Sequence, residues 1–358
     1  MIISRTPYRI SFFGGGTDYP VWYREHGGTV LGATIDKYCY LSCRHLPPFF
    51  KHRIRIVYSQ IENCQSVDDI AHPAVREVMR YLNIERGLEI HHDGDLPARS
   101  GMGSSSSFTV GLLHALHALK GFMPSKRQLA LEGIEIEQEK IKETVGSQDQ
   151  VLAAHGGFNH VIFEQNGEIA VRPVTLSAER LQELNAHLML FYTGIERTAS
   201  NIAETYVADV EAKKSQLRIM KHLVEEGLAI LNNGKDMAAF GNLLHEGWQV
   251  KRGLSGKVSN SHVDGLYEHA LSHGALGGKL LGAGGGGFML LFVPPGKQGR
   301  VREALQKFIC VPFHFEFSGS QVIFFEPERD YSVEDQARSL QEFNFVGEIE
   351  EPELVQVL

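Results

Sequence analysis

A hydroxyl and a carboxylate follow three glycines near the N-terminus. Gly14–Gly16 come after a strand-like stretch that contains Arg9, and Thr17 and Asp18 follow the glycines. Glycines let the backbone turn tightly and let a ligand approach it closely. The Asp18 carboxylate could accept hydrogen bonds from sugar hydroxyls, or it could cap the turn. The segment alone leaves both interpretations open.

A run of glycines and serines opens an apolar helix near residue 100. Gly101, Met102 and Gly103 lead into Ser104–Ser107, and apolar residues spaced three and four apart predict a helix over Ser104–Leu119. A helix N-terminus presents free N–H groups and a partial positive charge, which favours phosphate binding. The serine hydroxyls could cap the helix or bind Mg²⁺. The glycine and lysine spacing of a Walker A loop is missing.

A third glycine cluster lies near residue 280. Four consecutive glycines, Gly284–Gly287, precede the apolar stretch Phe288–Val293. Ordering so many glycines costs conformational entropy, which favours a close approach of the backbone to a ligand or to another chain segment. Two carboxylates lie between the second and third clusters: Glu137 late in a predicted helix, and Asp149 in a predicted turn three residues after a glycine. On their own, both carboxylates could be surface residues.

Short runs of β-branched and aromatic residues predict the strands that position these segments. They are Arg9–Phe13, Tyr38–Arg44, Arg53–Tyr58, Gly87–His92, Phe158–Phe163, Glu168–Val174, His187–Tyr192, Phe288–Val293, Val311–Phe317 and Gln321–Phe325. Helical spacing of apolar residues predicts the helices. They are Asp68–Tyr81, Ser104–Leu119, a helix that begins near Ser125 with a Ser125/Gln128 capping box, Ser200–Leu231, Asp236–Lys251, His262–His273 and Gln298–Phe308. The pattern changes near residue 185, which predicts a domain boundary there.

The formal charge of −8 is concentrated in the last part of the chain. Residues 327–358 hold nine acidic and two basic residues, so the rest is close to neutral and suits anion binding. Nucleic acid binding favours basic surfaces and is not expected. The longest apolar stretch, Gly282 to Val293, has 12 residues, whereas a membrane-spanning helix needs ~20. Four cysteines without CxxC spacing, and no recognisable signal peptide, predict a cytoplasmic protein without membrane association.

The order and spacing of the glycine clusters resemble the GHMP superfamily of small-molecule kinases, over residues 1 to about 326. The resemblance implies an α+β fold with two domains. The first, 1–185, is expected to be similar to ribosomal protein S5 domain 2 and to bind ATP. The second, 186–326, is expected to be ferredoxin-like, and 327–358 is an acidic extension.

The resemblance also implies which residues form the site. The ATP phosphates are expected on Gly101, Met102, Gly103, Ser104, Ser105 and Ser106. Mg²⁺ is expected on Ser104 or Ser105 together with Glu137. Asp149 is the expected catalytic residue, which accepts or orients the proton of the sugar hydroxyl, and Arg9 is expected to hold its charge and to stabilise the moving phosphoryl group. Substrate contacts are expected from Gly16, Thr17, Asp18, Arg5, Arg197, Gly284 and Gly285.

The first cluster departs from the galactokinase pattern. Galactokinases carry Gly-Glu-His-x-Asp-Tyr, whereas this chain has Gly-Gly-Gly-Thr-Asp-Tyr over residues 14–19. The clusters look most like those of the D-glycero-D-manno-heptose 7-phosphate kinases. These enzymes phosphorylate the anomeric hydroxyl to give the 1,7-bisphosphate, for GDP-heptose and surface polysaccharide (capsule or lipopolysaccharide). Such an acceptor needs an anion site, for which Arg5, Arg24 and Arg197 are candidates.

The residues also bear on three other functions. A fucokinase-type or galactokinase-type sugar-1-kinase on the same fold stays open. A sugar-sensing regulator without catalysis is disfavoured because Asp149, Glu137 and the serine loop are all retained. A dinucleotide-dependent dehydrogenase lacks the GxGxxG segment that opens a βαβ unit. The sequence leaves self-association open.

Overall fold

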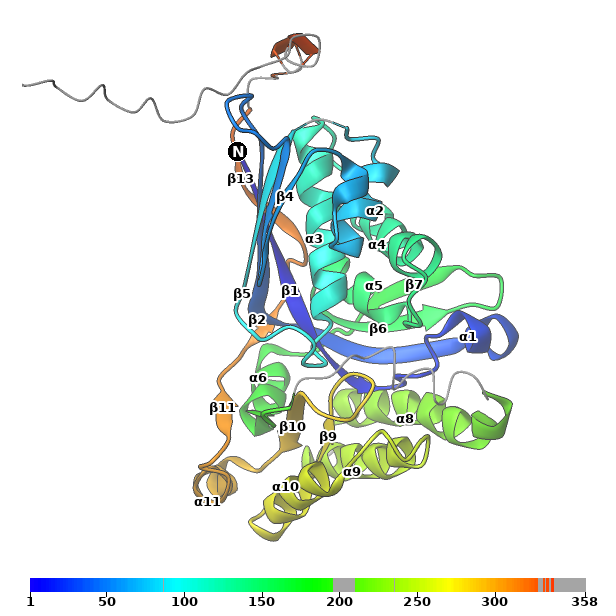
Figure 1. Ribbon diagram of the computed structural model, residues 1–358. Helices are drawn as coiled ribbons and strands as arrows, with labels where there is room; N and C mark the ends of the chain where they lie inside the picture. The colour runs from blue at the N-terminus through cyan, green and yellow to red at the C-terminus, as the bar shows by residue number, and fades with distance from the viewer. Residues whose placement is uncertain are drawn as a thin grey trace, which may run out of the picture.

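The computed structural model describes residues 1–85, 87–195, 210–234 and 236–327, together with residues 331, 333, 334, 336 and 337. Within these ranges, no helix is long and apolar enough to cross a membrane. The architecture is a mixed α+β fold with two antiparallel-rich sheets (Figure 1).

The larger sheet has nine strands in the described part of the chain. They are β1 (Ile2–Phe13), β2 (Gly28–His45), β3 (Ile54–Val57), β4 (Ile61–Cys64), β5 (Leu88–Gly94), β6 (Phe158–Phe163), β7 (Ile169–Pro173), β12 (Phe315–Glu316) and β13 (Gln321–Phe325). β1 and β2 pair antiparallel from Ile2 opposite Cys43 to Phe13 opposite Leu31. The register shifts next to Pro7, which has no backbone N–H to donate to the ladder.

Helices cover one face of the larger sheet (Figure 1). The described α-helices are α1 (Pro20–His26), α2 (Pro73–Tyr81), α3 (Ser104–Leu119), α4 (Lys126–Glu135), α5 (Gln148–His155), α6 (Ala178–His187), α8 (Lys214–Asn232), α9 (Ala238–Arg252), α10 (Ser261–Ser272) and α11 (Gln298–Ala304). α3 packs directly on β1 and β2, with α2, α4 and α5 around it. Most of α3 is buried, because it is surrounded by the sheet and these helices.

The smaller sheet follows the ferredoxin-like order. Its described strands are β8 (Leu188–Tyr192), β9 (Gly277–Leu280), β10 (Phe288–Phe292) and β11 (Ile309–Val311). They lie side by side in the order β11-β8-β10-β9 and pair antiparallel. α8, α9 and α10 connect β8 to β9, and α11 connects β10 to β11. Among the described elements, this sequence is the βαββαβ arrangement, with two additional described helices in its first crossover.

One hydrophobic core joins the two sheets. Phe12 and Phe13 of β1 each contact the Phe240 ring of α9, with ring centroids 5.6 and 5.2 Å apart. Phe240 in turn contacts Phe292 of β10 at 6.2 Å. β13 also brings residues 321–325 next to the N-terminal strand, because it pairs with the first half of β1 at the edge of the larger sheet.

Several predicted elements are confirmed closely and others need correction. α3, β6 and β13 occupy the predicted ranges. Asp149 lies in the first turn of α5 rather than in a free turn. Only half of the Ser125/Gln128 capping box forms, because the Gln128 side chain donates to Glu132 instead. The predicted strand Val311–Phe317 is two short strands, β11 and β12, which belong to different sheets.

Some elements were absent from the prediction or fall partly outside the described residues. α1, α6, β4 and β9 were not predicted. The predicted helix over 200–231 corresponds in its described part to α8, and residues 196–209 lie outside the described chain. The predicted boundary near residue 185 falls within α6, and the domain limits stay a prediction.

Candidate active site

Arg9 and Asp149 form a paired guanidinium and carboxylate where β1 meets α5. Arg9 Nε donates to Asp149 Oδ1 at 2.7 Å, and Nη2 donates to Oδ2 at 2.6 Å. The Arg9 side chain is 4% exposed, whereas that of Asp149 is 23% exposed. The two-point contact fixes the orientation of the carboxylate and leaves part of it accessible. The structure therefore brings together the two residues predicted to be catalytic.

The Gly101–Gly103 loop lies against this pair. Arg9 Nη1 donates to the Gly101 carbonyl at 2.7 Å, and the Arg9 N–H donates to the Met102 carbonyl at 3.1 Å. Gly103 has a left-handed φ of 75°, and a Cβ there would lie 3.2 Å from Arg9 Cγ and 3.4 Å from Asp149 Oδ2. Both the backbone conformation and the close approach favour glycine at this position.

α3 begins directly after Gly103 without a side-chain cap. The first N–H groups of a helix have no partner within the helix, so those of this turn can bind an anion. Ser104 is half-buried and Ser105 is exposed, whereas Ser106 is buried. Met102 is completely buried and its carbonyl accepts the Arg9 N–H, so its contact with a phosphate stays a prediction.

Glu137 contacts the first turn of α3 from a π-helical segment, Ile136–Lys140, that continues α4. Glu137 Oε2 accepts hydrogen bonds from Ser106 Oγ at 2.9 Å and from the Gln150 amide. Glu137 Oε1 is buried and has no hydrogen-bond partner in the described chain. Burial raises the pKa of Glu137 to about 7, although the hydrogen bond from Ser106 opposes the shift.

These oxygens fit a magnesium ion. Mg²⁺ prefers oxygen ligands and keeps waters and substrate phosphates in its shell. Glu137 Oε1 and the hydroxyls in the first turn of α3 can provide such ligands. Among the described residues, no group of three or more His, Cys, Asp or Glu side chains could hold a metal ion. The serine that touches Glu137 is Ser106, and the choice of Ser104 or Ser105 as a metal ligand stays a prediction.

Asp18 lies beside the Arg9–Asp149 pair and is almost completely buried. Its Oδ1 accepts the Gly16 N–H at 2.9 Å, and its Oδ2 accepts the Gln148 N–H at 3.2 Å. Burial raises the pKa of Asp18, and the nearby negative charge of Asp149 raises it further. A Cβ at Gly146 would lie 2.0 Å from Asp18 Oδ2, so the chain before α5 packs tightly on this carboxylate.

Thr17 holds the first glycine loop in place. Its hydroxyl lies 2.8 Å from the Gly14 carbonyl and 2.9 Å from the Thr29 carbonyl, and it accepts the Thr29 N–H at 3.0 Å. The residue is fully buried. Thr17 was predicted to bind substrate, but its hydroxyl is engaged within the protein.

The third glycine cluster packs on the second. The Phe288 N–H donates to the Ser100 carbonyl at 3.1 Å, and a Cβ at Gly287 would lie 2.0 Å from that same oxygen. The Gly285 N–H donates to the Val258 carbonyl at 2.8 Å. The glycines therefore allow a close approach to other chain segments, which is one of the two possibilities that the sequence left open.

Comparison with known proteins decides the family. The models of the GHMP kinases N terminal domain and the GHMP kinases C terminal match residues 69–157 and 221–309. The chain is 32% identical over 318 residues to D-glycero-alpha-D-manno-heptose 7-phosphate kinase of Campylobacter jejuni, which covers 86% of this chain and 93% of that protein. The chain belongs to the GHMP kinase family. It is an ATP-dependent sugar kinase.

Two further similarities agree with this family. The chain is 26% identical over 328 residues to a galactokinase of Thermococcus kodakarensis, covering 82% of this chain and 89% of that one. The crystal structure of a D-glycero-D-manno-heptose 1-phosphate kinase from Bacteroides thetaiotaomicron superposes with a TM-score of 0.75 at 25% identity. It covers 91% of this chain and 100% of that structure. The two-domain GHMP kinase fold predicted from the sequence is confirmed.

Not every residue predicted to bind the substrate of this GHMP kinase lies at the Arg9–Asp149 pair. Arg5 lies four residues before Arg9 on β1, and its Nη2 donates to Gln321 Oε1 at 2.9 Å. Its guanidinium also lies 4.5 Å from the centre of the Tyr38 ring. Arg197 lies outside the described residues. In the described chain, no hydrogen bond or ion pair joins Arg5 to the Arg9–Asp149 pair.

Two site residues of this GHMP kinase were not assigned from the sequence. Gln150 follows Asp149 and donates a hydrogen bond to Glu137. It therefore connects α5 to this candidate Mg²⁺ ligand. Lys279 is a buried residue of β9 whose Nζ donates to the Phe12 carbonyl at 2.9 Å. Lys279 is the first residue of the third glycine segment. Its position as a single charged residue before an apolar run is the sequence signal that could have identified it.

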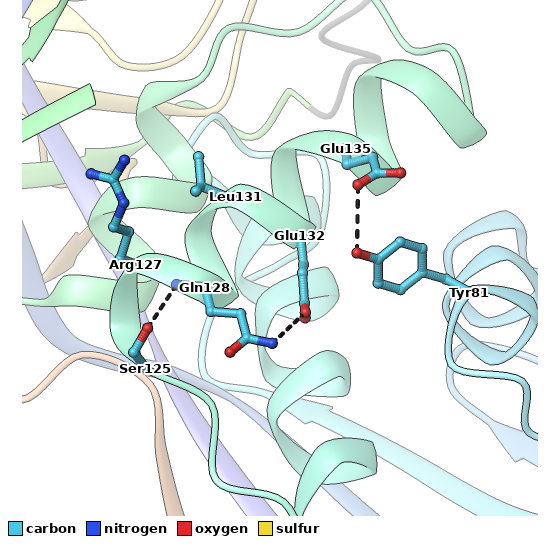
Figure 2. Close-up of a pocket in the computed structure, with 7 residues that line it drawn as sticks. All are labelled: Tyr81, Ser125, Arg127, Gln128, Leu131, Glu132 and Glu135. Atoms are coloured by element: carbon cyan, nitrogen blue, oxygen red, sulfur yellow. Dashed lines mark hydrogen bonds between the residues drawn. The ribbon is translucent and has the colours of Figure 1, made fainter. Parts of the chain in front are cut away.

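A separate cavity of about 370 Å³ lies between α2 and α4 (Figure 2). Its lining residues are Tyr81, Ser125, Arg127, Gln128, Leu131, Glu132 and Glu135. None of them belongs to the three glycine clusters or to the Arg9–Asp149 pair. We therefore place the kinase site at the α3 N-terminus rather than in this cavity.

Proposed function

We propose that this kinase phosphorylates the anomeric hydroxyl of D-glycero-D-manno-heptose 7-phosphate to the 1,7-bisphosphate, with Mg²⁺ and ATP, in the cytoplasm. Its product would supply GDP-heptose for surface polysaccharide. The Arg9–Asp149 pair at the N-terminus of α3, with the buried Asp18 beside it, is the observation that carries this proposal. The similarity to the Campylobacter jejuni heptose 7-phosphate kinase supports the choice of sugar.

The geometry supports an in-line transfer of the phosphoryl group, in which the protein positions the reactants and forms no covalent bond with them. The γ-phosphate would lie on the N–H groups of the first turn of α3, next to Gly103. Asp149 would take or orient the proton of the anomeric hydroxyl while the sugar oxygen bonds to the γ-phosphorus. The bond between that phosphorus and the β–γ bridging oxygen breaks, and ADP leaves with the electron pair. Arg9 fixes Asp149 for this role through its two hydrogen bonds.

Glu137 and the serine hydroxyls of the first turn of α3 would hold Mg²⁺ together with the ATP phosphates. The ion, when bound, neutralises phosphate charge. Asp18 would accept hydrogen bonds from sugar hydroxyls, and Gly16, Gly284 and Gly285 would provide close backbone surfaces around the acceptor.

A coupled ADP-release screen tests the proposal. The acceptors are D-glycero-D-manno-heptose, its 7-phosphate and 1-phosphate, mannose, fucose and galactose, each with ATP and Mg²⁺. We expect the highest kcat/KM with heptose 7-phosphate, and ³¹P NMR should place the new phosphate on the anomeric oxygen. A preference for fucose or galactose would support the alternative of another sugar-1-kinase. No turnover with any sugar would overturn the proposed function.

A further inference from the structure

Gly15 is the glycine of the first cluster that its own backbone conformation does not require. Gly14 and Gly16 have left-handed φ values of 82° and 100°, which side chains rarely adopt, whereas the φ of Gly15 lies outside that region. A Cβ at Gly15 would lie 3.4 Å from Ser11 Oγ and 3.5 Å from Gln148 Nε2, which is ordinary van der Waals contact. Alanine would therefore fit at Gly15, and glycine there leaves a space bordered by two polar side chains.

Ser11 brings a buried hydroxyl without a partner to this space. The residue is 5% exposed, and its Oγ has no hydrogen-bond partner in the described chain. On the same strand, Ser4 shows the usual arrangement, because its buried Oγ donates to the Gly111 carbonyl at 2.8 Å. An unpartnered buried hydroxyl destabilises a folded protein, and most such groups are bonded. A bound molecule would supply the partner that the chain does not provide to Ser11.

Gln148 brings a second unpartnered group, from the N-terminus of α5. Its Oε1 is buried and has no hydrogen-bond partner in the described chain. Its backbone N–H donates to Asp18 Oδ2 at 3.2 Å, and the Gly16 N–H donates to Oδ1 of the same carboxylate at 2.9 Å. Asp18 thereby holds the start of α5 against the first glycine loop. Asp149 is the next residue, so Gln148 directly precedes the carboxylate proposed to activate the acceptor.

We propose that Ser11 and Gln148 form a neutral subsite, opened by Gly15, that binds an uncharged hydroxyl of the acceptor and contributes to acceptor specificity. Gln148 Oε1 can accept a hydrogen bond from that hydroxyl, and Ser11 Oγ can donate one to it. Neither side chain carries a charge, whereas phosphate is bound best by charged donors, so the subsite favours a hydroxyl over a phosphate. The inference rests on the proposed function, because it takes the acceptor to be a sugar.

Three variants test the subsite by kinetics, with the best acceptor of the sugar screen. Gly15→Ala should raise the acceptor KM about tenfold, because its methyl group occupies the space, and should leave the ATP KM within about twofold. Ser11→Ala and Gln148→Met each remove one hydrogen bond and should raise the acceptor KM about two- to tenfold. None of the three should lower the Tm, because none removes a hydrogen bond within the folded chain. An unchanged acceptor KM, or equal rises in both KM values, would overturn the proposal.

Two controls separate the subsite from general effects on the fold. Ser4→Ala removes a partnered hydroxyl from the same strand, so it should lower the Tm and leave the acceptor KM unchanged. Gly299→Ala adds a methyl group in open space, at another glycine without a left-handed φ, and should also leave the acceptor KM unchanged. If Ser4→Ala raised the acceptor KM as much as Ser11→Ala, Ser11 would act only through the strand, and the proposal would fail.

The side-chain amide of Gln148 gives a readout that needs no turnover. Its ¹⁵N signal, in protein labelled at glutamine, is assigned by its loss in Gln148→Met. With Mg²⁺ and a non-hydrolysable ATP analogue present, the accepted sugar should shift this signal in wild type. In Gly15→Ala the same shift should need about tenfold more sugar.

This titration also distinguishes the subsite from the proposed function. A signal that does not move with a sugar that the enzyme phosphorylates overturns the subsite and leaves the proposed function standing. If no sugar is phosphorylated, the proposed function fails, and the titration is run with every sugar of the screen. A shift that Gly15→Ala weakens then still supports the subsite, and the absence of any shift overturns it.

Discussion

Arg9 holds both oxygens of Asp149, so this partly exposed carboxylate has a fixed orientation. The buried carboxylates around this pair accept hydrogen bonds: Asp18 from two backbone N–H groups and Glu137 from the Ser106 hydroxyl. Glu137 keeps one oxygen unpartnered within the described chain. At the scale of single residues, the candidate site is therefore organised to place carboxylate oxygens near the N-terminus of α3.

Asp149→Asn tests the catalytic assignment. The amide cannot accept the proton of the hydroxyl, so kcat should fall by about two to four orders of magnitude, the usual contribution of a general base. The ATP affinity should stay within a few fold, because we propose that ATP binds at the α3 N-terminus. Steady-state kinetics and calorimetric titration of ATP measure the two effects. Glu168→Gln, an exposed control, should match wild type. Near-normal turnover of Asp149→Asn would refute the assignment.

Glu137 makes the stability of the folded protein depend on pH. Its pKa is raised to about 7 by burial, so the folded protein binds a proton that the unfolded chain releases near the ordinary value of 4.5. The stabilisation from this proton is fully present below pH 4.5 and is lost as the pH rises through about 7. Without metal, the Tm of wild type should therefore fall relative to that of Glu137→Gln between pH 5 and 8. A constant Tm difference across this range would contradict the assignment.

At the scale of elements, α3 connects the Gly101–Gly103 loop to the rest of the candidate site. Its N-terminus lies against Arg9 through Gly103, its first turn touches Glu137 through Ser106, and its length packs on β1 and β2. The loop conformation depends on left-handed glycines, because Gly101 has a φ of 83° and Gly103 a φ of 75°. The N-terminus of α3, β1 and α5 therefore position one another.

Gly103→Ala tests this arrangement. The added Cβ would press on Arg9 Cγ and on Asp149 Oδ2, and the left-handed backbone itself costs about 1–2 kcal/mol for a non-glycine residue. Gly121→Ala is a matched control, because Gly121 follows the other end of α3 with a φ of 74° and open space around it. Both variants should lose similar stability in chemical denaturation, but only Gly103→Ala should lose most of its kcat/KM. Equal activities would show that the close contact is unimportant.

At the scale of the whole molecule, the last described strands complete the first sheet. β13 pairs with β1, with Arg5 opposite Gln321 and Ile2 opposite Phe325, and β12 pairs with β2. The Thr6 and Ser320 hydroxyls add a buried hydrogen bond of 2.9 Å. β8 to β11 form their own sheet between these two parts of the chain. Folding of the larger sheet therefore depends on residues more than 300 positions away.

Truncation tests this dependence. A chain that ends at residue 312 lacks β12 and β13, so the edge of β1 loses its hydrogen-bonded neighbour. We expect a lower Tm and loss of the single sharp unfolding transition in calorimetry. A chain that ends at residue 327 keeps both strands and should retain the transition. An unchanged Tm after the first truncation would show that β13 contributes little.

The sequence predicted the local elements and the ligand-binding segments well. Helical spacing located α3 to the residue, and the glycine clusters indicated a sugar kinase of the GHMP type. It failed at α1 and β9, where short or glycine-containing segments carry weak periodicity. It also failed at Asp149, because the first turn of a short helix looks like a turn when only the sequence is read.

By itself, the sequence determined the family, the two-domain fold and the segments that approach the ligands, because glycine runs and apolar spacing are local properties. Only the tertiary structure decided which side chains meet. It joined Arg9 to Asp149 across 140 residues and placed the Ser106 hydroxyl against Glu137. It also engaged the Thr17 hydroxyl within its own loop and bonded Lys279 of the smaller sheet to the Phe12 carbonyl of the larger sheet. Such pairings depend on how sheets and helices pack. A side chain becomes a ligand, a partner or a structural support according to what that packing brings within hydrogen-bonding distance.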